Sequence, residues 1–140
     1  MYILKTEATF DSAHFLSGYD GKCSNIHGHC WKIEVSAAGE KLIESGSRKG
    51  MLIDFADLKK IVRRLADSFD HALIIEKGSL RQSTLQALTE ENFHIIELPF
   101  RPTAENLAAH FFSLLKEEGI CVKTVAVYET TENCAIYEEV

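Results

Sequence analysis

The chain has 140 residues, of which 46% are hydrophobic and 26% charged, and its formal net charge at pH 7 is −6. This length predicts one domain over residues 1–140, and the balance of apolar and charged residues excludes a disordered or fibrous chain. Because the chain is acidic, it lacks the positive surface with which proteins bind nucleic acids, and we expect no nucleic-acid partner.

The patterning of the chain predicts a cytoplasmic protein. No apolar run reaches the roughly 18 residues that a membrane span needs, so we expect no membrane association. Charged residues interrupt the N-terminal segment before an apolar run forms, which argues against a signal peptide. The four cysteines form no C-x-x-C pair, which favours free thiols in a reducing compartment. Three of them, Cys30, Cys121 and Cys134, are expected to pack as small apolar residues.

The first half of the chain predicts two long strands and one helix. Residues 2–15 alternate, with apolar side chains on the even positions, and residues 27–37 alternate more cleanly, with apolar side chains on the odd positions. Asp54 is a candidate N-cap, and apolar residues at helical spacing follow it, which predicts an amphipathic helix over residues 55–69.

The second half predicts two helices and three short strands. In chain order they cover residues 79–92 (helix), 95–98 (strand), 103–118 (helix), 121–129 (strand) and 134–139 (strand). Strands and helices do not alternate regularly, so the pattern favours an antiparallel α+β fold over a doubly wound one.

Both long strands end their apolar face in histidine. His14 ends the first row, and extending the period of the second strand backwards puts His27 and His29 on its apolar face. Gly28 between them leaves room for close approach, so the two imidazoles can reach one ion. Three neutral imidazoles without a fourth protein ligand are typical of catalytic zinc. The alternatives are ordinary strand histidines, or a structural zinc site with Cys23 as the fourth ligand.

Three further segments of the chain carry candidate chemistry, each with an ordinary alternative. Cys23 lies four residues before His27 in a polar loop, where a thiol beside a cation acts as a base or nucleophile; otherwise it is a plain loop cysteine. Asp70 and His71 at a helix end offer an imidazole beside a carboxylate. The ordinary alternative is a C-terminal histidine that interacts with the helix dipole. Glu129 follows the apolar face of a strand, where a carboxylate needs a donor-rich ligand unless water reaches it.

Six segments in chain order together resemble one known family. They are Phe10-Asp11-Ser12-Ala13-His14-Phe15, Cys23-x-x-x-His27-Gly28-His29, Met51-Leu52-Ile53-Asp54-Phe55 with Leu58-Lys59, Asp70-His71, Pro102-Thr103-Ala104-Glu105-Asn106 and Val127-Tyr128-Glu129-Thr130. The combination resembles the 6-pyruvoyltetrahydropterin synthase / 6-carboxytetrahydropterin synthase family over essentially the whole chain.

The resemblance implies an α+β tunnelling fold (T-fold). In this fold a four-stranded antiparallel sheet carries helices on one face, and several subunits assemble to close a barrel. It also implies that His14, His27 and His29 bind Zn²⁺ and that Cys23 is the catalytic base.

The resemblance further implies the roles of the remaining site residues. Asp70 and His71 would form the proton-transfer partner of the base. Glu129 would anchor the pterin ring by accepting from its 2-amino and ring N–H groups. Thr103 and Glu105 would lie in or near the pterin pocket.

Within the family, the three-residue gap between Cys23 and His27 is similar to that of the queuosine-pathway 6-carboxytetrahydropterin synthases. These enzymes convert 7,8-dihydroneopterin triphosphate to 6-carboxy-5,6,7,8-tetrahydropterin and release acetaldehyde and triphosphate. We therefore expect a zinc-dependent carbon–carbon lyase. The open edges and uncovered face of a small sheet further predict a homo-oligomer, a hexamer of two trimers.

Three alternatives stay open at this point. Two are enzymes of the same family: the pyruvoyl-forming synthase, and a folate-pathway enzyme that cleaves the side chain, although such members tend to carry Glu at the position of Cys23. The third is a non-catalytic metal-binding pterin carrier. The chain departs from the family pattern at Phe69, at Leu73-Ile74, at Ala104 and in the longer 75–100 segment, which bears on substrate preference.

Overall fold

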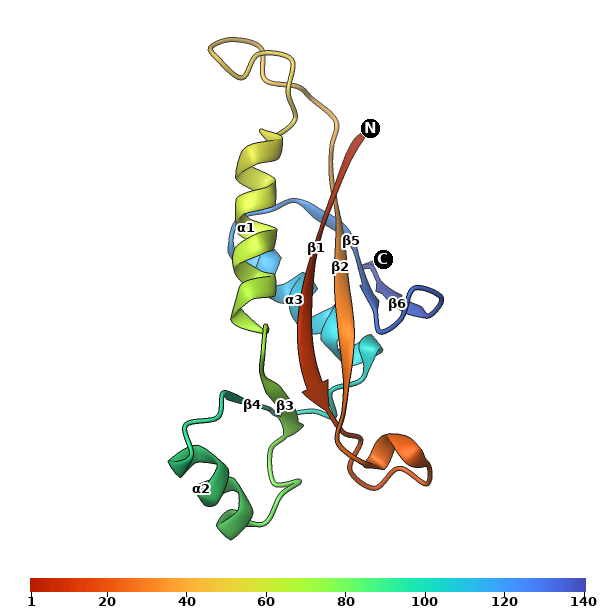
Figure 1. Ribbon diagram of the computed structural model, residues 1–140. Helices are drawn as coiled ribbons and strands as arrows, with labels where there is room; N and C mark the ends of the chain where they lie inside the picture. Colours follow the sequence, from red (N-terminus) through yellow and green to blue (C-terminus); the bar gives the residue numbers. More distant parts are fainter.

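The protein consists of one six-stranded sheet, two helices packed on one of its faces and a third helix that extends away from it (Figure 1). The structure is a computed structural model that describes residues 1–140. The elements are β1 (Tyr2–His14), β2 (His27–Gly39), α1 (Phe55–Ser68), β3 (Leu73–Glu76), α2 (Gln82–Glu90), β4 (Ile95–Leu98), α3 (Ala104–Glu117), β5 (Val122–Tyr128) and β6 (Cys134–Tyr137). A short 3₁₀ turn over Lys22–Ser24 lies between β1 and β2.

The antiparallel pair β1–β2 forms the centre of the sheet. Each strand has 13 residues, and their register runs without a shift from Tyr2 opposite Gly39 to His14 opposite His27. The predicted alternation is confirmed, because the even positions of β1 and the odd positions of β2 carry the buried apolar side chains. Phe10 and Trp31 stack across the pair, with ring centroids 5.9 Å apart.

The sheet differs from the four-stranded antiparallel sheet that was predicted. Its strand order is β4-β3-β1-β2-β5-β6, and β3 pairs in parallel with both β1 and β4. The sequence pattern missed β3 because Leu73-Ile74-Ile75 is a short continuous apolar run, which shows no period of two. The α+β class and the helices on one face are confirmed.

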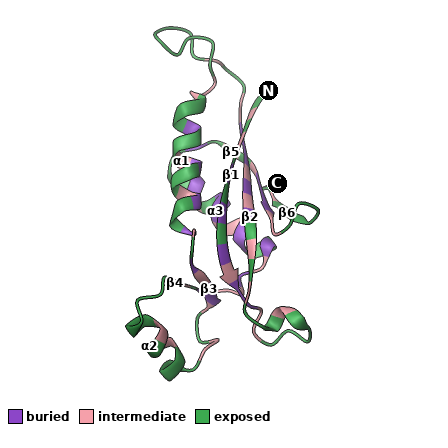
Figure 2. Cartoon of the chain, in the orientation of Figure 1, coloured by how far each residue is buried: buried purple, intermediate pink, exposed green.

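Two capped helices cover the inner face of the sheet. Asp54 caps α1 by accepting from the Ala56 N–H at 2.8 Å, as predicted, and Thr103, at the start of the predicted 103–118 helix, caps α3 by accepting from the Asn106 N–H at 3.2 Å. Figure 2 shows buried residues where α1 and α3 face the sheet, whereas α2 buries none. None of the three helices combines the length and apolar character needed to cross a bilayer.

All four cysteines are free thiols, as predicted, but the expected packing of three of them is wrong. Cys30, Cys121 and Cys134 are exposed, whereas Cys23 is half-buried. Cys30 lies on the outward row of β2, Cys121 precedes β5, and Cys134 begins the edge strand β6. Their positions at strand edges and on the open face leave their side chains in solvent.

Candidate metal centre

Three imidazoles meet at the end of the β1–β2 pair. The register places His14 directly opposite His27, and His29 lies two residues further along the same face of β2. The candidate ligand nitrogens of the three side chains all lie within 4.8 Å of one another. His14 Nε2 and His27 Nε2 are only 3.0 Å apart. The structure thus brings together the three residues that the sequence nominated.

Backbone carbonyls orient two of these rings. His14 Nδ1 lies 2.8 Å from the carbonyl oxygen of Pro102, and His27 Nδ1 lies 2.8 Å from that of Asn25. Since a carbonyl oxygen only accepts, each Nδ1 must carry the proton, and each neutral ring then offers a lone pair at Nε2. Two lone pairs 3.0 Å apart cannot hydrogen-bond to each other, but a cation between them would satisfy both.

The cluster also contains an unpartnered buried atom. His29 Nε2 is buried and has no hydrogen-bond partner. His14 is only 1% exposed, and this burial lowers its pKa to about 4; burial also lowers the pKa of His29. Neutral imidazoles with free ring nitrogens are the ligand form that zinc prefers. The chemistry of the donor set therefore fits a bound metal ion.

Cys23 lies near this cluster in the chain but outside its set of mutually close ligand atoms. Cys23 is half-buried in the 3₁₀ turn, and its carbonyl oxygen accepts a hydrogen bond from the Leu16 N–H at 2.9 Å. The atoms that lie within 4.8 Å of one another belong to the three histidines alone. This geometry does not fit the four-ligand structural site, which would need the Cys23 thiolate at bonding distance.

Asp70 and His71 form a hydrogen-bonded pair in the turn after α1. His71 Nδ1 lies 2.7 Å from Asp70 Oδ2, and their side chains are 80% and 38% exposed. The hydrogen bond to Asp70 raises the pKa of His71. The pKa of Asp70 is lowered first by the Asp11 N–H that it accepts at 2.8 Å and then by His71. His71 is therefore held in its charged form to a higher pH than a free histidine.

The dyad does not join the histidine cluster of its own chain. His71 lines a hollow of about 310 Å³ whose other walls include Ala13, Ile26 and Phe93. Ala13 precedes His14 on β1, so their side chains point to opposite sides of the strand. The dyad and the cluster thus lie on different sides of β1 within one chain.

The three residues nominated for substrate binding line one hollow of about 240 Å³ beside the cluster. Its walls include Glu129, Thr103 and Glu105, together with Leu16, Ala104, Asn133 and Cys134. The half-buried Glu129 is close enough that its charge opposes the lowering of the His29 pKa. The hollow and the histidine cluster are therefore neighbouring parts of one site.

The sequence model of a family described as 6-pyruvoyl tetrahydropterin synthase matches residues 3–140. The chain belongs to this family. A Haemophilus influenzae protein named 6-carboxy-5,6,7,8-tetrahydropterin synthase is 39% identical over 142 residues, which cover 99% of this chain and 100% of that protein. A Synechocystis sp. protein of the same name is 31% identical over 139 residues, covering 98% and 93%.

Two solved structures share the fold. The Caenorhabditis elegans 6-pyruvoyl tetrahydropterin synthase matches with a TM-score of 0.66 and 26% identity, covering 100% of this chain and 98% of that one. An uncharacterized protein from Wolinella succinogenes matches with a TM-score of 0.79 and 20% identity, covering 99% and 98%. The second likeness concerns the fold alone.

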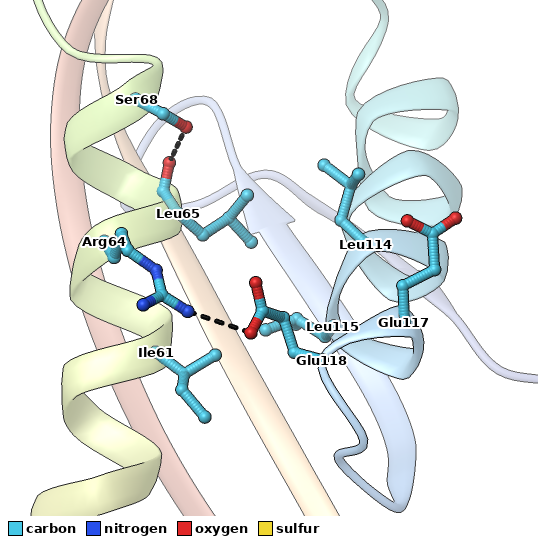
Figure 3. A pocket seen from close by; sticks show the side chains of 8 residues that line it. All are labelled: Ile61, Arg64, Leu65, Ser68, Leu114, Leu115, Glu117 and Glu118. Atoms are coloured by element: carbon cyan, nitrogen blue, oxygen red, sulfur yellow. Dashed lines mark hydrogen bonds and ion pairs between the residues drawn. The ribbon is translucent and has the colours of Figure 1, made fainter.

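Another hollow, of about 440 Å³, lies between α1 and α3 (Figure 3). Its walls are Ile61, Arg64, Leu65, Ser68, Leu114, Leu115, Glu117 and Glu118. The Arg64–Glu118 ion pair, 2.9 Å long, joins the two helices across it. No histidine or cysteine and none of the family motif residues faces this hollow, so the histidine cluster is the candidate site.

Sequence reasoning missed the groups that orient the cluster. Pro102 and Asn25 act through backbone carbonyls, which leave no residue signature, although Pro102 belongs to a motif that was noted for the pterin pocket. Trp31 lies beneath the cluster, with its ring centroid 4.8 Å from that of His14 and 5.1 Å from that of His29. The sequence pattern places Trp31 only in the apolar row formed by the odd positions of residues 27–37.

Proposed function

We propose that this protein is a zinc-dependent lyase of queuosine (7-deazaguanine) biosynthesis. It converts 7,8-dihydroneopterin triphosphate and one water molecule to 6-carboxy-5,6,7,8-tetrahydropterin, acetaldehyde and triphosphate. The observation that carries this proposal is the cluster of three imidazoles, one with an unpartnered buried nitrogen, beside the hollow of Glu129. The names of the full-length relatives support the same reaction. Residues 1–140 form one catalytic domain, which works in the cytoplasm.

His14, His27 and His29 would hold the zinc ion, with the Pro102 and Asn25 carbonyls fixing the rings of the first two. When bound, zinc supplies Lewis acidity to the oxygens of the substrate side chain. Three protein ligands leave the open coordination position that a catalytic site needs.

Proton transfer is assigned to Cys23, Asp70 and His71. Cys23 takes a proton from the substrate side chain next to the ring, and its place outside the ligand set leaves the thiol free for this role. His71 returns or accepts a proton, and the Asp70 carboxylate 2.7 Å away keeps its imidazole charged.

Recognition of the pterin ring is assigned to the hollow of Glu129. The carboxylate accepts from the 2-amino and ring N–H groups, an arrangement that offsets the cost of keeping a half-buried charge beside an apolar strand. Thr103 accepts from the Asn106 N–H, so its own hydroxyl proton is free to donate to a ligand. Glu105 borders the same hollow.

The active assembly is a homo-oligomer, a hexamer of two trimers in which sheets join into a barrel. The edge strands β4 and β6 each leave one side unpaired, which offers edges for this joining. Because the dyad lies on the other side of β1 from its own cluster, a neighbouring chain would supply the dyad of each site. Light scattering should give six chains per particle, and a fully active monomer would contradict the assembly.

The decisive experiment is the product mass after incubation of the zinc-loaded protein with dihydroneopterin triphosphate. A 6-carboxytetrahydropterin product with acetaldehyde supports the proposal. A 6-pyruvoyl or 6-hydroxymethyl product would assign another reaction of the family. Unchanged substrate that stays bound would assign a pterin carrier.

A further inference from the structure

The end of β1 is fastened to the turn that carries the Asp70–His71 dyad. The Asp11 N–H donates to Asp70 Oδ1 at 2.8 Å, and the His71 N–H donates to the Asp11 carbonyl at 2.6 Å. One step further, the Ala13 N–H donates to the Ala72 carbonyl at 2.9 Å. The turn that carries the dyad is therefore held by Asp11 and Ala13 of one strand.

Ser12 supplies a side-chain link in this fastening. It is 6% exposed, and its hydroxyl donates to the Phe69 carbonyl while accepting from the Ala72 N–H at 3.1 Å. Phe69 and Ala72 flank the dyad on either side. A single buried hydroxyl thus uses both its donor and an acceptor site to hold the two ends of the turn together.

The same residue also contacts the wall of the histidine cluster. The Ser12 carbonyl accepts from Trp31 Nε1 at 3.1 Å, and the Trp31 ring lies beside His14 and His29. Ser12 therefore forms hydrogen bonds to the turn of the dyad through its hydroxyl, and to Trp31 beside the histidine cluster through its backbone carbonyl.

The turn needs such support because its conformation is costly. His71 has φ of +50°, in the left-handed region that residues other than glycine seldom adopt. Residues in such a conformation persist where their surroundings fix them. Because 80% of the His71 side chain is exposed, its packing supplies little of that restraint, and the bonds from Asp11 and Ser12 must supply it.

We propose that Ser12 is a positioning residue of the reaction: its hydroxyl holds the Asp70–His71 turn in the conformation that aims His71 at the substrate. This inference rests on the proposed function for the role of His71. Ser12 itself touches neither metal nor substrate. In the proposed assembly it fixes the dyad that serves the neighbouring chain, while its own chain's cluster stays intact.

The test compares Ser12→Ala with Ser36→Ala. Ser36 is a matched control, because it is buried to the same 6% in the adjacent strand β2 but pairs with Lys5, away from the site. We expect Ser12→Ala to keep its zinc content and KM, while kcat falls roughly tenfold or more, as for other displaced proton-transfer groups. Ser36→Ala should keep wild-type kcat.

A second readout does not depend on turnover. The pKa of His71, followed by NMR, should fall in Ser12→Ala toward the ordinary value of about 6.5 and stay raised in Ser36→Ala. The charged or titratable groups that face His71 are Asp70, Asp11 and His94, and none of them is changed in either variant. If the wild-type protein turns over no pterin, the proposed function fails, yet this titration still tests the positioning.

A folded Ser12→Ala variant with unchanged kcat and unchanged His71 titration would overturn the inference. Should that variant fail to fold, hydrogen exchange of the wild-type protein carries the test. The amide protons of His71 and Ala72 must then be as protected as that of Ala13. Exchange at the rate of an open loop would show that the turn is not held, and would overturn the inference equally.

Discussion

The protein contains two groups of histidines, and their surroundings shift the pKa of His14 and the pKa of His71 in opposite directions. The cluster at the end of β1 and β2 is withdrawn from water, and burial lowers the pKa of His14 to about 4. The Asp70–His71 dyad lies in solvent on the other side of β1, and the carboxylate raises the pKa of His71. One side chain thus serves as a neutral ligand in one place and as a proton carrier in the other.

The environment of each histidine, and not the residue type, therefore sets its chemical role. In the cluster, backbone carbonyls accept hydrogen bonds from the Nδ1–H groups of His14 and His27, and the buried Nε2 of His29 has no partner. In the dyad, a carboxylate faces the ring and favours the imidazolium. Five single substitutions test this contrast.

Replacing His27 or His29 with alanine should abolish metal binding. Each change removes one of three imidazoles, and two ligands are too few to hold a catalytic zinc ion. Metal analysis should fall from about one zinc per chain to near zero, a stoichiometry typical of such sites. His94→Ala is the control, because His94 lies on the surface near the dyad and should leave zinc in place. Full zinc content in either cluster variant would contradict the assignment.

Cys23→Ala should keep its zinc and lose most of its turnover. Loss of a general base costs on the order of 10²–10⁴ in rate. The exposed Cys30 on β2 offers a matched control, since Cys30→Ala removes the same thiol outside the site. If Cys23→Ala instead loses zinc, the thiol is a ligand. If it retains zinc and runs within about tenfold of wild type, the base lies elsewhere.

Asp70→Asn should move the alkaline limb of the kcat profile to lower pH. The Asp70 carboxylate raises the pKa of His71, so the imidazolium of the Asp70→Asn variant loses its proton at a lower pH. The pair stabilises the fold only between the lowered pKa of Asp70 and the raised pKa of His71; stability is lost as pH falls through the first or rises through the second. An NMR titration of His71 gives the same shift directly, and an unmoved limb would exclude His71 as the proton carrier.

Glu129→Gln should raise KM more than it lowers kcat. Its hydrogen bonds reach a part of the pterin that changes little in the reaction, so they bind substrate and transition state alike. We expect KM to rise roughly tenfold, as for the loss of one charge-assisted hydrogen bond. Glu105→Gln is a companion change at the rim of the same hollow and should have a smaller effect. An unchanged KM in Glu129→Gln would place the pterin anchor elsewhere.

The central strand pair and its histidines could be predicted from the sequence because their pattern is local. Alternation along β1 and β2 fixes which side chains share a face, and His14, His27 and His29 extend the apolar rows by that same period. The caps of α1 and α3 were equally readable, because Asp54 and Thr103 act on residues two or three positions away.

Neither the strand β3 nor the hydrogen bonds that hold the Asp70–His71 turn could be predicted from a local sequence pattern. Leu73–Glu76 pairs in parallel with β1, and this contact joins segments about 60 residues apart whose pairing no local period encodes. The Ser12 hydroxyl likewise bonds to Phe69 and Ala72 across the same distance. The exposure of Cys30 and Cys134 also depended on which sheet face and edge remain uncovered.

The residue types of the site and the strand faces on which they lie follow from the amino-acid sequence, because strand geometry converts spacing along the chain into side-chain direction. The protonation and orientation of these side chains depend on the folded structure. The pKa of His14 depends on its burial and on the carbonyl of Pro102, 88 positions along the chain, and the pKa of His71 depends on its hydrogen bond to the Asp70 carboxylate. Burial and hydrogen bonding are properties of the packed chain, because both require groups that only folding brings together.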